Sequence, residues 1–177
     1  RDPEMSRGLG DVYKRQNKRS LNRYLEDVFE DCLLNEKELG ILFLDIDHFK
    51  QLNDRYGHGR GDEGICAVAD TLKKCFPEDY VARYGGDEFL VVMTGRDREY
   101  AEEHARQLCM GIRECEIPNE DSSVEPWLTI SVGGVCAIPK EPNRVWDFLS
   151  AADKTLYDQK NEQKGKVRFY VGEGQYL

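Results

Sequence analysis

The chain has 177 residues, of which 40% are hydrophobic, enough for one domain with an apolar core of its own. Its formal net charge of −9 argues against a nucleic-acid surface, so no nucleic-acid partner is expected. No apolar run approaches the roughly 20 residues of a membrane span and no signal peptide is recognisable, which predicts a cytoplasmic location.

Six cysteines are scattered along the chain without a C-x-x-C pair, and most of them fall at apolar positions. This pattern predicts reduced thiols in the core of a cytosolic protein. They are Cys32, Cys66, Cys75, Cys109, Cys115 and Cys136.

Residues 1–16 lack a clear apolar period, and we expect them to be a poorly ordered linker or tag remnant without a function. The domain itself is expected to span residues 17–177. It would begin with an amphipathic helix over about residues 18–34, because apolar side chains recur there at helical spacing. These are Leu21, Leu25, Val28, Phe29 and Cys32.

A short apolar run, Leu39 and 41–44, fits a strand that is buried on both faces. It ends in Asp45-Ile46-Asp47, and alternation along a strand puts the two carboxylates on one side. Carboxylate oxygens bind hard divalent cations, and Mg²⁺ takes one or two of them together with substrate phosphates, which points to a nucleoside triphosphate. Alternatively, the two aspartates only cap the helix that follows.

Two helical segments are expected after this strand. A short helix over residues 48–55 should be interrupted at Gly57, and its start can direct backbone N–H groups toward phosphate. Residues 57–63 then predict a flexible loop that runs into a second helix with Asp62 as its N-cap.

Strand-forming residues lie on both sides of Gly85-Gly86, and this predicts a tight hairpin whose central residues need a positive φ. Asp87 and Glu88 would then lie at its tip, where adjacent carboxylates need a cation or a proton between them. Taken alone, this pair of carboxylates is more simply explained as a solvent-exposed acidic turn. The second acidic strand end, at Asp45, favours a cation site instead.

The C-terminal half predicts a helix over about residues 97–115, a loop over 116–125, a strand over 127–138, a helix from Val145 and a closing strand over 167–171. Strands and helices therefore follow the order β-α-α-β-β-α-β-α-β. This order favours an α+β domain with a central, mostly antiparallel sheet and a ferredoxin-like core flanked by helices.

Three segments of the sequence resemble the GGDEF domain, the diguanylate cyclase family. Residues 85–89 spell the family name, and residues 44–54 and 56–63 are similar to the family's other two blocks. The similarity runs from about Asn17 to about Arg168. It implies a nucleotidyl cyclase palm and a bacterial signalling enzyme, a nucleotidyltransferase that condenses two GTP into cyclic di-GMP and two pyrophosphates.

The resemblance also implies roles for individual residues. Asp45, the carbonyl of Ile46, Asp87 and Glu88 would hold Mg²⁺, with Mn²⁺ as a possible substitute, and Asp87 and Glu88 would be the catalytic carboxylates, Asp87 accepting the proton. The substrate would be bound by Phe49, Lys50, Asn53, His58, Asp62, Gly85, Gly86 and Lys160.

The resemblance implies that Asp62 pairs with the Watson–Crick edge of guanine. The chemistry agrees, because a carboxylate only accepts hydrogen bonds and guanine offers N1–H and its 2-amino group. Adenine leaves polar groups unmatched there, at a cost of ~1–3 kcal/mol, which selects GTP over ATP about tenfold or better. Lys50 is equally consistent with a solvated surface lysine. The tail around Lys160 matches the family pattern loosely, with Lys166 where the family has arginine.

Turnover would need a homodimer in which each 3′-hydroxyl attacks the α-phosphorus of the other GTP. In the family a sensor domain precedes the first helix, so we expect a longer natural protein, which could be anchored to a membrane through its other segments. The alternative is a catalytically inactive module that binds GTP or cyclic di-GMP as a regulatory sensor. A cyclase for another base is opposed by Asp62.

Many cyclases carry an inhibitory Arg-x-x-Asp site just before the hairpin. Here Asp79 keeps the acidic position, but Phe76 replaces the arginine, so the site is degenerate. Phenylalanine cannot make the bidentate contacts of a guanidinium. We therefore expect no strong product inhibition through this site.

Overall fold

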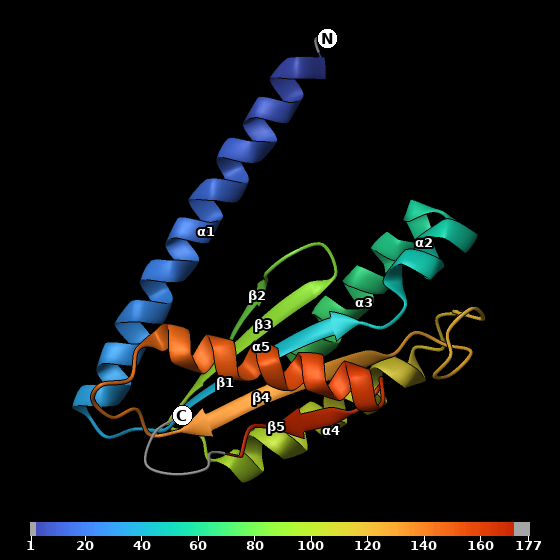
Figure 1. The fold of residues 1–177 in the computed structure, drawn as a ribbon. Coiled ribbons are helices and arrows are strands. Elements are labelled where there is room, and N and C mark those ends of the chain that lie inside the picture. The colour runs from blue at the N-terminus through green and yellow to red at the C-terminus, as the bar shows by residue number, and fades with distance from the viewer. Residues whose placement is uncertain (1–2, 172–177) are drawn as a thin grey trace.

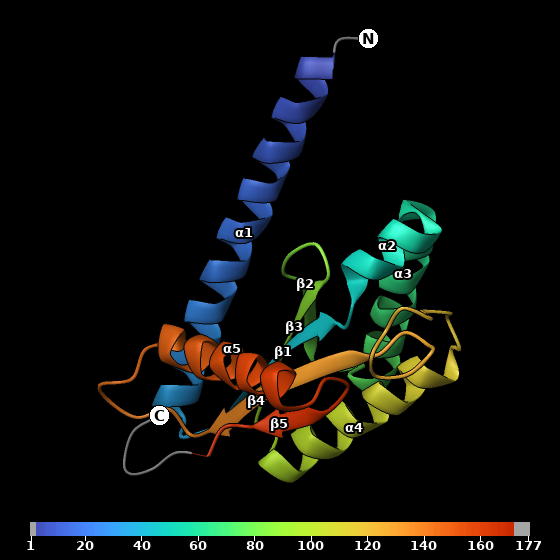
Figure 2. The same cartoon turned by 45° about the vertical axis from the view of Figure 1, so that its right-hand side comes forward.

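The structure is a computed structural model that describes the backbone of residues 3–171 and the side chains of residues 19–171. This part of the chain forms one five-stranded sheet with helices on both faces (Figures 1 and 2). In chain order the elements are α1 (Pro3–Leu34), β1 (Leu39–Ile46), α2 (Phe49–Tyr56), α3 (His58–Cys75), β2 (Tyr80–Arg83), β3 (Glu88–Thr94), α4 (Arg98–Glu114), β4 (Ile130–Ala137), α5 (Val145–Glu162) and β5 (Val167–Phe169).

The strand order across the sheet is β2-β3-β1-β4-β5. Every neighbouring pair is antiparallel except β4 and β5, which are parallel. The predicted α+β class, the mostly antiparallel sheet and the order of the elements from β1 onward are therefore confirmed. Because β1 is the central strand, its acidic end lies between the ends of β3 and β4.

The side chains of β1 alternate between two apolar cores, which is why its sequence is apolar at successive positions. Leu42 and Leu44 join the core on the side of α3 and α4, whereas Ile41 and Phe43 join the core on the side of α1 and α5. All four are buried. The predicted burial of this strand on both faces is confirmed.

Helix α1 is longer than the apolar period predicted, because it begins at Pro3. Its C-terminal half contacts the domain through Leu21, Leu25, Phe29 and Cys32, while its N-terminal half extends away from the sheet (Figures 1 and 2). The division into residues 1–16 and 17–177 stays a prediction, and residues 1–2 and 172–177 lie outside the described part. No helix within residues 3–171 has the length and apolarity that crossing a membrane requires.

Helix α5 approaches β4 closely at Gly133. A Cβ atom built on Gly133 would lie 2.5 Å from the carbonyl oxygen of Ala152 and 2.5 Å from the Cα of Leu156, both of them backbone atoms of α5. Ordinary van der Waals contact needs about 3.5 Å or more. The absence of a side chain at residue 133 therefore sets the distance between α5 and the sheet.

The cysteines are only partly placed as predicted. All six are free thiols, but Cys66 and Cys115 are exposed, so the prediction that they lie in the core was wrong. Both lie on helix surfaces or ends that face solvent, where an apolar residue type alone does not indicate burial. Cys32 and Cys109 are buried, and burial raises the pKa of the Cys109 thiol to about 12.

Candidate functional site

The acidic ends of β1 and β3 lie side by side. Asp45 is directly opposite Glu88 in the β1–β3 register, and residues opposite one another in an antiparallel pair point to the same face. Asp87 precedes β3, and its carbonyl oxygen accepts a hydrogen bond of 3.2 Å from the backbone N–H of Ile46. The structure thus brings together the three carboxylates that the sequence placed at separate strand ends.

The hairpin between β2 and β3 differs from the predicted tight turn. Four residues, 84–87, separate the strands, and neither Gly85 nor Gly86 has a φ between +20° and +160°. The prediction of a positive φ was wrong because a four-residue loop can reverse the chain without a mirror-image turn. Glycine is favoured at residue 85 for a different reason. A Cβ atom there would lie only 2.7 Å from the carboxylate oxygen Oε2 of Glu88.

Arg83 holds this loop in place. Its guanidinium donates hydrogen bonds to the carbonyl oxygens of Gly85 and Gly86, at 2.6–3.1 Å. The backbone N–H groups of Tyr84 and Gly85 both donate to the carbonyl of Glu88. The loop that carries Asp87 is therefore fixed by its own backbone and by one side chain that sequence reasoning did not single out.

Lys160 of α5 reaches the end of β1 and pairs with Asp45. The distance from Lys160 Nζ to Asp45 Oδ1 is 2.7 Å, and the Asp45 side chain is only 13% exposed. Burial raises the pKa of the Asp45 carboxyl, the Lys160 ammonium opposes that increase, and the negative charges of Asp87 and Asp47 add to it. The predicted phosphate-binding lysine thus lies at the predicted metal-binding carboxylate.

Asp47 has a structural role. Its side chain is fully buried and accepts hydrogen bonds from the hydroxyls of Thr129, at 2.8 Å, and Ser131, at 2.7 Å. The N-cap of α2 is His48, whose side chain makes no cap bond. Asp47 therefore neither faces the acidic cluster with an open carboxylate nor caps α2, so the capping alternative does not hold for Asp47.

Helices α2 and α3 meet beside this cluster. Gly57, at φ 82°, ends α2 and is also the N-cap of α3, so α3 begins at His58. Residues 58–63 are therefore helical, and the predicted flexible loop with Asp62 as N-cap was wrong. The side chain of Asn53 lies directly against Gly61, at a spacing that leaves no room for a Cβ. Asn53 is half-buried and Asp62 exposed, one position from this contact.

The other predicted substrate residues lie around the same helices. Lys50 and His58 are exposed, and Phe49 is partly buried against the core on the side of α3. Within the described part of the chain, no ion pair involves Lys50, so both of its interpretations remain open.

The loop between α4 and β4 is tied to α2. Arg55 of α2 pairs with Glu120 and Asp121, and Ser123 Oγ lies 3.0 Å from His48 Nε2. Asn119, fully buried, donates to the backbone carbonyl of Asp47 at 3.4 Å. The sequence offered no signal for these contacts, because the loop is a polar stretch without a period.

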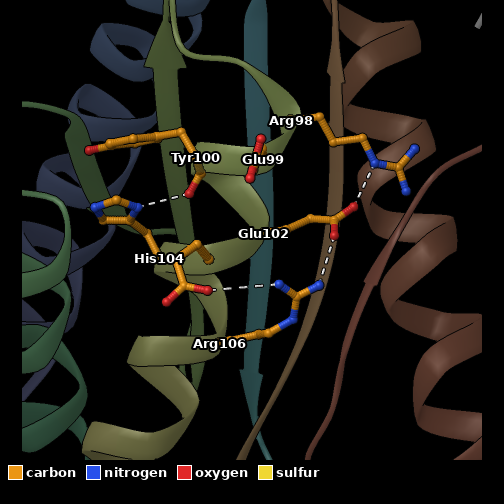
Figure 3. A pocket seen from close by; sticks show the side chains of 7 residues that line it. Arg98, Glu99, Tyr100, Glu102, His104 and Arg106 are labelled. Carbon is orange, nitrogen blue, oxygen red and sulfur yellow. Dashed lines mark hydrogen bonds and ion pairs between the residues drawn. The ribbon is translucent and has the colours of Figure 1, made fainter.

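A surface hollow lies on α4 (Figure 3). Its charged side chains neutralise one another, since Glu102 pairs with both Arg98 and Arg106. His104 stacks on Tyr100 with the ring centres 3.8 Å apart. None of the predicted site residues lines this hollow. Its lining comes from one helix: Arg98, Glu99, Tyr100, Glu102, Glu103, His104 and Arg106.

The position predicted to be a degenerate inhibitory site lies next to this hollow. Phe76 is 1% exposed and contacts the ring of His104, with the ring centres 5.8 Å apart. Asp79 accepts a hydrogen bond of 3.1 Å from the Tyr100 hydroxyl, and the Arg96 guanidinium lies over the Tyr100 ring. One carboxylate oxygen of Asp79 is thus engaged by a neighbouring side chain of α4.

The acidic cluster alone does not form a complete metal centre. Among the side chains of residues 19–171, no three or more His, Cys, Asp or Glu residues are arranged so that they could hold a metal ion by themselves. A Mg²⁺ site that relies on substrate phosphates needs only one or two protein carboxylates. Asp45 and its neighbours meet that smaller requirement.

Comparison with known proteins gives consistent matches. The family model described as "Diguanylate cyclase, GGDEF domain" matches residues 14–166. The Probable diguanylate cyclase DgcC of Escherichia coli (strain K12) is 32% identical over 161 residues, which is 90% of this chain and 42% of DgcC. The chain therefore spans less than half the length of this curated relative.

Solved structures agree in fold. A shortened form of TpbB (YfiN) from Pseudomonas aeruginosa (PAO1) that comprises only the GGDEF domain is 27% identical, with a TM-score of 0.73 over 84% of this chain and 86% of that one. The active GGEEF domain of a diguanylate cyclase from Vibrio cholerae shares the fold, with a TM-score of 0.78, 24% identity and coverage of 88% and 97%.

Proposed function

The chain belongs to the diguanylate cyclase family of GGDEF domains, and we propose that it condenses two molecules of GTP into cyclic di-GMP and two pyrophosphates. One observation carries the proposal: Asp45, Asp87 and Glu88 converge at the ends of two paired strands, with Lys160 beside them. Carboxylates next to a lysine are the groups needed to bind a metal-bound triphosphate and to accept a proton.

The residues at the strand ends fit Mg²⁺, or Mn²⁺ in its place. The donor set contains only oxygen: the carboxylates of Asp45, Asp87 and Glu88 and the carbonyl of Ile46. When bound, such ions neutralise the triphosphate and make the 3′-hydroxyl easier to deprotonate. Asp87, held at the end of the fixed hairpin loop, would accept that proton.

Guanine would be bound between α2 and α3. Asn53 lies against Gly61, the residue before Asp62, and the Asp62 carboxylate can accept hydrogen bonds from N1–H and the 2-amino group. The start of α2 has no side-chain cap, which leaves its first N–H groups available to phosphate. Together these features support GTP over ATP.

Catalysis would require two copies of the chain. Each subunit would hold one GTP, and the two would face one another so that each 3′-hydroxyl attacks the other α-phosphorus. A single copy holds only one reactant and should turn over slowly. The full-length protein would act in the cytoplasm, with an N-terminal sensor domain that sets how often two copies meet.

The direct test is incubation of purified protein with GTP and Mg²⁺, with cyclic di-GMP followed by chromatography. We expect Asp87→Asn to lower the rate at least about 10²-fold, because general-base catalysis contributes roughly 10²–10⁴-fold. Asp70→Asn, on the exposed surface of α3, is the matched control and should leave the rate unchanged. Equal rates for wild type and Asp87→Asn would contradict the role of Asp87. Bound GTP without product from either would favour a regulatory binding module.

Product inhibition through the position before the hairpin should be absent. Phe76 is buried in the core and cannot replace the guanidinium of the family's inhibitory arginine, and the Asp79 carboxylate already accepts a hydrogen bond from Tyr100. The initial rate should stay constant as cyclic di-GMP is added up to micromolar concentrations. Noncompetitive inhibition below micromolar levels that disappears in Asp79→Ala would refute this prediction.

A further inference from the structure

We propose that Lys160 is the resident counter-ion of Asp45, which an entering metal ion must displace, and that this exchange couples metal binding to triphosphate binding. The inference rests on the proposed function. Its starting point is the ion pair of 2.7 Å between Lys160 Nζ and Asp45 Oδ1, at the carboxylate proposed for the metal.

Asp45 has one positively charged partner among the side chains that the structure describes. In the part of the chain with described side chains, Lys160 is the only basic residue that forms an ion pair with Asp45. The remaining charges near Asp45 are negative, since Asp87 and Asp47 both act on it. A mostly buried carboxylate among other carboxylates needs a cation, and the ammonium meets that need when no metal is bound.

The Lys160 side chain can change position while helix α5 stays in place. Backbone contact at Gly133 fixes α5 against β4, so the Cα of Lys160 is fixed too. Its four-carbon stem is flexible and its side chain is 29% exposed, which leaves the ammonium free to swing toward a ligand in the open part of the site. A triphosphate beside Asp45 would be such a ligand.

The consequence is a coupling between two ligands. A metal ion that arrives alone must compete with the ammonium and leave Lys160 without a partner. A metal ion that arrives with a triphosphate gives Lys160 a new anionic partner at the same moment. Each ligand therefore strengthens the binding of the other, and by linkage the two enhancement factors are equal.

The test is Mn²⁺ binding to the purified protein, followed by electron paramagnetic resonance, with and without a GTP analogue whose α–β bridge cannot be cleaved. For Lys160→Met we expect Mn²⁺ alone to bind about tenfold more tightly than to wild type, which corresponds to about 1.4 kcal/mol. The enhancement of Mn²⁺ affinity by the analogue should fall by a similar factor. A purely structural lysine would instead weaken both kinds of binding.

Three further variants complete the design. Lys160→Arg keeps a cation at Asp45 and should retain weak binding of free Mn²⁺, and Lys154→Met removes an exposed charge from the same helix and should match wild type. Lys160→Gln replaces Lys160→Met if the latter does not fold. Unchanged affinity for free Mn²⁺ in folded Lys160→Met or Lys160→Gln overturns the inference, while wild type that binds no Mn²⁺ even with the analogue overturns the proposed function as well.

Discussion

Gly133→Ala is expected to lower the free energy of unfolding by about 3 kcal/mol or more. Overpacking a core with one methyl group typically costs about 1–3 kcal/mol, and the higher values apply where the neighbours cannot move. Here the neighbours are the carbonyl oxygen of Ala152 and the Cα of Leu156, backbone atoms in the middle of α5. Urea unfolding followed by circular dichroism would measure the change.

Gly59→Ala is the matched control for this substitution. A Cβ at Gly59 meets nothing within 4 Å, and the residue lies in the first turn of α3. The change should be neutral or raise stability, by up to about 1 kcal/mol, since alanine is the better helix former. If Gly133→Ala proves as stable as Gly59→Ala, then α5 can shift on the sheet, and the fixed position assigned to Lys160 is wrong.

Asp47→Ala is expected to lower the free energy of unfolding by about 3 kcal/mol. Hydrogen bonds to a charged group contribute about 1.5–3 kcal/mol each, and their loss leaves buried hydroxyls without an acceptor. The hydroxyls of Thr129 and Ser131 would both lose their partner. Ser131 Oγ also accepts from the backbone N–H of Gly165, so the loop between α5 and β5 should loosen with it.

Asp47→Asn separates shape from charge at this position. The amide keeps the volume and one acceptor oxygen, and the Thr129 hydroxyl can turn to accept from the new N–H. We therefore expect a smaller loss than for Asp47→Ala, about 1–2 kcal/mol by the same unfolding measurement. Asp70→Ala, an exposed position on α3, should change stability by less than about 0.5 kcal/mol. Loss in Asp47→Ala no larger than in Asp70→Ala would refute the buried network.

Local sequence patterns predicted the features that depend on residues close together in the chain. The continuous apolar run of β1 predicted its burial on both faces, and the acidic strand ends predicted that Asp45 and Glu88 lie close together. The predictions were wrong where one backbone angle decides between two local conformations. Gly57 at φ 82° starts α3 immediately, so Asp62 lies inside a helix, and the four-residue loop removes the need for a positive φ at Gly85.

The polar partners were beyond the reach of sequence reasoning. Lys160 is 115 positions from Asp45, and Thr129 and Ser131 are 82 and 84 positions from Asp47. Such pairs depend on how α5 and β4 are placed on the sheet, which no local pattern encodes. A lysine in the last turn of α5 could be predicted to bind phosphate, but its resident partner could not.

Burial of Phe76 limits which side chains this position can accept. An arginine at this position would place a guanidinium where the present side chain is 1% exposed, in the core that also contains Leu72 and Leu108. The single substitution Phe76→Arg should therefore destabilise the domain before it could create a ligand site. Creating such a site would need further substitutions around Tyr100 and His104, because their side chains contact Asp79 and Phe76.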